Sequence, residues 1–147
     1  MTTEQKILSS LPYCEPFLFV DRITNINENS IAGSYTFNPE SFFYKGHFKD
    51  KPVTPGVILL ECMGQIGLVC FGIYLLNLHE KKTDFSIVLS NLESDFFKIV
   101  YPEETVFVHS EKMYLRNNIL KCRIRLSDNN NETITTTIAS CKFKLES

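Results

Sequence analysis

The feature that most constrains this chain is an apolar segment at residues 57–76, which reads VILLECMGQIGLVCFGIYLL and contains one charged residue, Glu61. Twenty residues exceed the usual length of a strand, so we expect a helix. Because the segment is apolar on nearly every side, the helix is either buried in a folded domain or crosses a membrane. Glu61 and Gln65 lie on one helix face, and a carboxylate inside a bilayer costs about 2.5–3.5 kcal/mol. We therefore expect a buried central helix and no membrane span.

Three glycines interrupt this segment, at positions 64, 67 and 72. Glycine is a poor helix residue, and its lack of a Cβ atom allows another surface to approach the helix backbone. A sheet wrapped around the helix would make such an approach. We therefore expect close contacts at Gly64, Gly67 and Gly72.

The rest of the chain has mostly strand-like patterns. A short amphipathic helix is expected at residues 3–9, ended by Leu11-Pro12. Period-two alternation and β-branched or aromatic runs predict strands at residues 17–25, 31–37, 85–92, 105–115, 120–126 and 133–145. Turns are expected at Asn117-Asn118 and at residues 128–131, so the C-terminal half is interpreted as an antiparallel meander. The prediction is one α+β domain over residues 1–147, with a long helix on a sheet of five or six strands.

Composition excludes several classes of function. The chain has 15 Lys and Arg against 17 Asp and Glu, with no long run of either sign, so nucleic acid is not an expected partner. Its five cysteines are scattered and include no C-x-x-C pair, which indicates reduced packing residues and no metal site. The first residues contain no apolar signal-peptide core, so we expect a cytoplasmic location.

The candidate chemistry lies in His47 and Glu61. A carboxyl group among apolar neighbours is favoured in its neutral form, and a neutral acid can protonate a leaving hydroxyl. The imidazole of His47, in a loop rich in Gly and Pro, could remove a proton next to a thioester carbonyl. The free backbone N–H groups at the helix start, around Gly56 and Val57, could stabilise the oxyanion that forms.

Simpler interpretations stand beside this one. His47 could be an ordinary hydrogen-bonding loop residue, and Glu61 a paired structural acid. Gln65 is expected to support Glu61 or a backbone group from one turn away. A nucleophilic role for Cys62 or Cys70 is weaker, because a helix-buried thiol is usually inert.

Three blocks of sequence, in order and with matching spacing, carry a family resemblance. They are Leu11-Pro12-x-x-x-Pro16-Phe17-Leu18-Phe19-Val20-Asp21-Arg22, then Gly46-His47-Phe48, then Pro52-Val53-x-Pro55-Gly56-Val57 with Glu61-x-x-x-Gln65. Together they resemble the 3-hydroxyacyl-[acyl-carrier-protein] dehydratases of fatty acid synthesis.

The resemblance implies a hot-dog fold, in which a curled antiparallel sheet wraps a long central helix. It implies a homodimer, with any further assembly left open, whose active sites each join His47 of one chain to Glu61 of the other. His47 would remove the C2 proton, Glu61 would act on the C3 hydroxyl, and the Gly56 N–H would bind the thioester carbonyl. Phe48 and Pro55 would support the site, the substrate would arrive on the phosphopantetheine arm of an acyl carrier protein, and no cofactor would take part.

The chain also departs from the family pattern. Lys49 and Asp50 replace a Pro-Gly step after His47, and the stretch at residues 95–102, basic in many members, has a single lysine. Weaker steering of a generic acidic carrier follows, so we expect a dedicated carrier or an unusual acyl chain, as in pathways that build aryl-polyene or resorcinol-type pigments. The alternatives are a hot-dog protein that binds acyl thioesters without catalysis, and a hot-dog thioesterase.

Overall fold

The predicted long helix is the centre of the fold. A computed structural model describes residues 1–81 and 83–146, and in it α2 (Gly56–Gly64), the π-helical stretch η2 (Gln65–Cys70) and α3 (Phe71–Leu75) form one continuous helix. This helix is long and apolar enough to cross a membrane, but 72% of its most apolar window is buried inside the fold. The helix is therefore the core of the domain, and its apolar character is used against the sheet.

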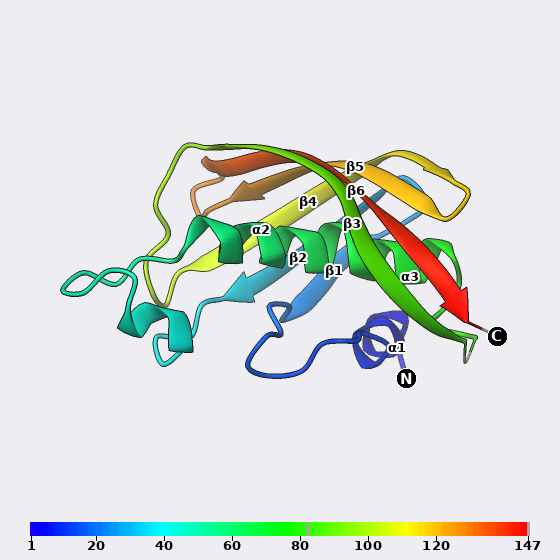
Figure 1. Ribbon diagram of the computed structural model, residues 1–147, viewed down its shortest axis with the longest axis horizontal. Helices are drawn as coiled ribbons and strands as arrows, with labels where there is room; N and C mark the ends of the chain where they lie inside the picture. The colour runs from blue at the N-terminus through cyan, green and yellow to red at the C-terminus, as the bar shows by residue number, and fades with distance from the viewer. Residues whose placement is uncertain (82, 147) are drawn as a thin grey trace.

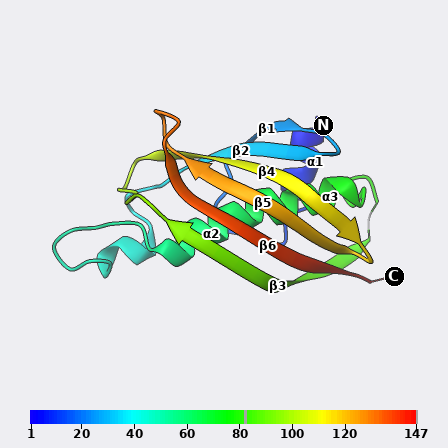
Figure 2. The ribbon, with the colours of Figure 1, turned by 90° about the horizontal axis from the view of Figure 1, so that it is seen from above.

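A six-stranded antiparallel sheet curls over the long helix, with the strand order β1-β2-β4-β5-β6-β3. Figures 1 and 2 show the helix running beneath the sheet, with α1 (Thr3–Ser9) at the end where both termini lie. The strands are β1 (Arg22–Ile26), β2 (Ser30–Thr36), β3 (Asp84–Phe96), β4 (Thr105–Arg116), β5 (Ile119–Ser127) and β6 (Thr133–Glu146). A short 3-10 helix, η1 (Phe42–Lys45), precedes the long helix.

The expected strand patterns are confirmed where one face is buried. In β5 the side chains of Leu120, Cys122, Ile124 and Leu126 are all buried. The predicted turn between β4 and β5 is formed by Asn117 and Asn118, whose φ angles of 51° and 61° suit a tight hairpin.

Two expectations about the strands are wrong. The first strand begins at Arg22 and not at residue 17, because the backbone at Phe17 and Phe19 bonds to the Gln65 side chain. The C-terminal half is a meander only from β4 to β6, since β3 pairs with β6 and β4 pairs with β2. The long β3 strand is thus one edge of the sheet.

The glycines of the long helix behave differently from one another. A Cβ atom at Gly72 would lie 2.1 Å from Cζ of Phe143, and one at Gly67 would lie 2.9 Å from Cδ1 of Ile124. Both positions therefore need glycine for close packing of helix on sheet, as expected. The expected close contact at Gly64 is wrong, because a Cβ atom there would meet no other element within 4 Å, and Gly64 instead lines a groove.

Candidate active site

A groove of about 490 Å³ runs between the long helix and strands β3 and β6. Most of its wall is apolar: Phe17, Val57, Leu60, Leu68, Val69, Ile87, Leu89, Leu92, Ile124, Ala139 and Cys141. The remaining lining residues are Gly64 and three with polar side-chain groups, Tyr13, Glu61 and Thr137. The groove therefore suits an acyl chain with a reactive polar centre near Glu61.

Glu61 is held in this groove by Gln65, one turn further along the helix. The Gln65 Nε2 atom donates to Glu61 Oε2 at 2.9 Å and to the Phe17 carbonyl at 3.0 Å. Its Oε1 atom accepts from the Phe19 N–H at 2.8 Å, and the Gln65 side chain is fully buried. Gln65 thus joins Glu61 to the chain segment at Phe17 and Phe19.

Tyr13 is a polar residue of the groove that sequence reasoning missed. Burial raises the pKa of its phenol, and the nearby Glu61 carboxyl group adds to the effect. Tyr13 therefore keeps its proton and offers a hydroxyl to any ligand in the groove. Its place directly after Leu11-Pro12, in an irregular segment, gives no periodic signal that could have revealed it.

Leu89 and Leu92 were also missed as members of one wall. Residues three apart in a strand normally point to opposite faces. An irregularity in the pairing between Leu89 and Asn91 adds one residue, so both leucines reach the groove. A bulge of this kind depends on the partner strand and is not visible in the local sequence.

His47 lies in the loop between η1 and α2, and its ring orientation is fixed. The His47 Nδ1 atom is 3.0 Å from the Val53 carbonyl oxygen, and a carbonyl can only accept. Nδ1 is therefore the protonated nitrogen of the neutral ring, and Nε2 carries the free lone pair. The Phe48 ring stacks on the imidazole, with 4.1 Å between ring centroids.

The loop itself is tied to the body at its base. The Val53 N–H donates to the His47 carbonyl at 2.7 Å, and the Thr54 N–H donates to the Val100 carbonyl at 2.8 Å. The Tyr44 and Thr54 hydroxyls are 2.5 Å apart. These hydrogen bonds fix the base of the loop that carries the His47 imidazole.

The loop points away from its own groove. Residues 46–55 project beyond the N-terminal end of α2 in both views (Figures 1 and 2). Among the described residues that line the groove, Glu61 is present and His47 is not. One chain therefore does not bring the two predicted residues together in a single cavity.

Gly56 and Val57 begin α2, directly after Pro55 at the N-cap position. The next two N–H groups, of Ile58 and Leu59, donate to the Pro55 carbonyl. Within residues 1–81 and 83–146, the N–H groups of Gly56 and Val57 have no such acceptor. Val57 lines the groove, so the start of α2, where such donors are free, lies at one end of the groove.

Neither cysteine nor metal chemistry is supported by the geometry. Burial raises the pKa of the Cys62 and Cys70 thiols, so neither is a ready thiolate. In the part of the chain that the structure describes, no group of three or more His, Cys, Asp or Glu side chains is arranged to hold a metal ion.

A family model and the similar proteins of known sequence point to the same family. The FabA-like domain family matches residues 11–137. The 3-hydroxyacyl-[acyl-carrier-protein] dehydratase FabZ of Caldicellulosiruptor bescii is 34% identical over 119 residues, covering 80% of this chain and 82% of the relative. The enzyme of the same name from Bacillus licheniformis is 34% identical over 124 residues, covering 82% of each chain.

Solved structures share the fold at low identity. The dehydratase heterocomplex ApeI:P of Xenorhabdus doucetiae matches with a TM-score of 0.76 and 13% identity, covering 92% of this chain and 89% of that chain. A hypothetical thioesterase with coenzyme A from Streptococcus pneumoniae matches with a TM-score of 0.63 and 9% identity, covering 84% and 85%.

The curled sheet around a long helix, with an acidic side chain in the groove between them, defines a hot-dog fold protein. Within that class, the chain belongs to the FabA-like family, and its curated relatives are dehydratases named FabZ.

Proposed function

We propose that this protein dehydrates a 3-hydroxyacyl thioester, carried on acyl carrier protein, to the trans-2-enoyl thioester in the cytoplasm. The observation that carries the proposal is Glu61, whose carboxyl group is the only one among the described lining residues of the apolar groove. The names of the FabZ relatives support the same reaction.

The proposed mechanism divides the acid and base roles. The free Nε2 atom of His47 removes the C2 proton, and electron density moves to the thioester oxygen, where the Gly56 and Val57 N–H groups donate to it. As the C2–C3 double bond forms, the C3–O bond breaks and the leaving hydroxyl takes a proton from Glu61. The products are the enoyl thioester and water, and proton transfer from His47 to Glu61 restores the starting state.

We further propose that each site is shared between two copies of the chain. The loop at residues 46–55 projects away from its own groove, which supports a reach toward a second subunit. β3 is an edge strand with exposed apolar side chains, including Val88 and Leu89, at 49% and 57% exposure. An edge of this kind is suited to pairing with another copy.

The first test is dehydration of a 3-hydroxyacyl thioester by wild type, His47→Ala and Glu61→Gln. Loss of either group should lower kcat by about 10²–10⁴-fold, with folding checked by circular dichroism. Equal rates for the wild type and both folded variants would contradict the proposal.

The second test mixes the two inactive variants after partial unfolding and refolding. If His47 and Glu61 meet across the interface, a mixed dimer has one intact site, and random mixing restores about one quarter of wild-type activity. If each subunit uses its own pair, no site is intact and activity stays absent.

A thioesterase is the second candidate, because solved structures described as thioesterases share the fold. It would release a free thiol from an acyl thioester, whereas dehydration leaves the thioester intact. A thiol-reactive dye therefore separates the two reactions. A protein that only binds acyl thioesters would release no thiol and form no enoyl thioester.

A further inference from the structure

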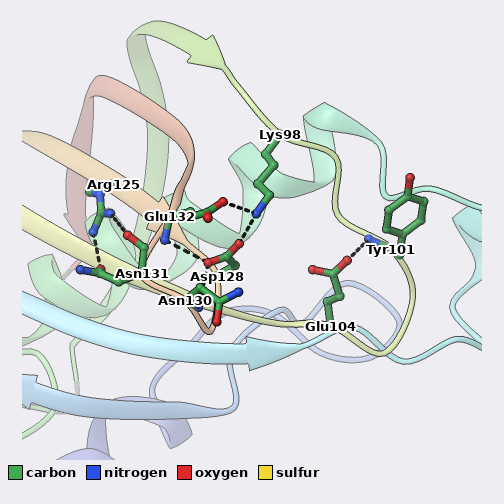
Figure 3. Close-up of polar contacts among 8 residues, drawn as sticks. All are labelled: Lys98, Tyr101, Glu104, Arg125, Asp128, Asn130, Asn131 and Glu132. Carbon is green, nitrogen blue, oxygen red and sulfur yellow. Dashed lines mark hydrogen bonds and ion pairs between the residues drawn. The ribbon is translucent and has the colours of Figure 1, made fainter.

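The segment that joins β3 to β4 contains one cation, Lys98, and its charge is paired with two carboxylates. The Lys98 Nζ atom lies 2.5 Å from Asp128 Oδ2 and 2.6 Å from Glu132 Oε2, in the turn between β5 and β6 (Figure 3). Asp128 is itself fixed, because the N–H groups of Asn130 and Glu132 donate to its Oδ1 atom. Lys98 therefore links the β3–β4 segment to the β5–β6 turn. Because its charge is neutralised there, it attracts an acidic partner only weakly.

At the loop that carries His47, in contrast, the lysine charges are not paired with carboxylates of the described residues. Lys45, the last residue of η1, and Lys49 and Lys51 in the loop are exposed in the single chain, and within residues 1–81 and 83–146 none of them has a carboxylate oxygen within 4.0 Å. Three positive charges and the negative charge of Asp50 leave this short stretch at +2, in a chain whose formal charge is −2. Positive charge is thus concentrated beside the proposed base.

Lys49 and Lys51 belong to a tight turn at residues 48–51. The N–H of Phe48 donates to the Lys51 carbonyl at 3.0 Å, and the N–H of Lys51 donates back to the Phe48 carbonyl at 3.2 Å. Lys49 and Asp50 occupy the two positions between them. Lys45 lies closer to the body, in a shallow hollow that Glu40 and Glu103 also line, so Lys49 and Lys51 offer the freer charges.

We propose that the His47 loop is the docking element for the carrier protein, with Lys45, Lys49 and Lys51 contacting acidic side chains around its prosthetic arm. This inference rests on the proposed function and adds the surface that delivers the substrate. The arm itself contains a phosphodiester, so it is anionic where it reaches the site, and acidic side chains on the carrier would add to that charge. Docking on this loop brings the thioester to the base at the moment of binding.

The test compares two substrates in the full-length protein: a 3-hydroxyacyl group on an acidic acyl carrier protein, and the same group on N-acetylcysteamine. In the K45Q/K49Q/K51Q variant, KM for the carrier substrate should rise by about 3- to 100-fold, as expected for three exposed charge contacts. The kcat/KM for the N-acetylcysteamine thioester should stay within about twofold of wild type, because that substrate makes no carrier contact.

The matched control removes the same charge at the opposite end of the sheet, in the K81Q/K142Q/K144Q variant. All three of these lysines are exposed, and we expect wild-type kinetics with both substrates. Lys98→Gln should also leave the carrier KM unchanged, because that charge is already paired.

The outcomes separate this inference from the function it rests on. An unchanged carrier KM in the loop variant, or an equal rise in the control variant, overturns the docking surface while dehydration stands. Absence of dehydration with both substrates in the wild type overturns the function itself. An equal loss on both substrates in the loop variant indicates damage to the site and also counts against docking.

Discussion

At the scale of single residues, Gln65 is the position on which the proposed site depends most. It has no exposed surface, and it satisfies the Phe17 carbonyl, the Phe19 N–H and one Glu61 oxygen at once. Removal of a buried partner leaves its polar neighbours unsatisfied, at about 1–3 kcal/mol for each group. Gln65 thus affects both the stability of the fold and the position of the acid.

Gln65→Met keeps the length of the side chain and removes all its hydrogen bonds. We expect the free energy of unfolding to fall by about 2–4 kcal/mol, measured by urea unfolding at one fixed protein concentration. Met63→Leu is the matched control, since it changes a buried apolar side chain of the same helix and should cost less than about 1.5 kcal/mol. Equal stability of the two variants would show that the hydrogen bonds contribute nothing.

Sequence reasoning expected Gln65 to support Glu61 or a backbone group, because a spacing of four residues on a helix brings two side chains together, and Gln65 contacts both. It could not predict the orientation of the His47 ring, which depends on a carbonyl six residues away across a loop. It also missed Tyr13, whose place in the groove depends on long-range packing.

At the scale of elements, the helix was predictable and its irregularity was not. The π-helical stretch η2 contains the Gly67 carbonyl, which accepts from the buried Ser110 hydroxyl of β4 at 2.9 Å. That partner is 43 residues away in sequence, so local helix propensity cannot predict the contact. Length and apolarity predict where a helix lies, while its internal hydrogen bonding depends on the sheet against which it packs.

The glycines of this helix allow a paired test. Gly72→Ala should destabilise the protein by about 1–3 kcal/mol, because the new Cβ atom would overlap the buried Phe143 ring. Gly64→Ala meets open space and should stabilise it by up to about 1 kcal/mol through helix propensity. Thermal unfolding of both variants measures the difference, and shifts of the same sign would contradict the close packing of helix on sheet at Gly72.

At the scale of the whole molecule, strand order was beyond reach of local patterns. Each strand after the long helix was expected, but the pairing of β3 with β6 places β3 at the edge of the sheet, far from its neighbour in sequence. Alternation reports which face of a strand is buried and says nothing about which strand lies beside it. The consequence for function is large, because the edge is the proposed contact between subunits.

Val88→Arg tests that contact, because Val88 is an exposed apolar side chain of β3 and is not among the lining residues of the groove. A cation on the exposed edge should convert the dimer to a monomer and lower activity, as measured by analytical ultracentrifugation and the dehydration assay. Phe107→Arg is the control, because Phe107 is also an exposed apolar side chain but lies on the interior strand β4. Dissociation of both variants, or of neither, would argue against the β3 edge as the interface.

The outward reach of residues 46–55 has an evolutionary consequence if the sites are shared. Each dimer then holds two copies of the base and two of the acid, although one of each suffices for a working centre. After a gene duplication, one copy could lose His47 and the other Glu61 while their mixed assembly kept a functioning site. A lineage of this fold could in this way become dependent on two paralogous genes without any gain in chemistry.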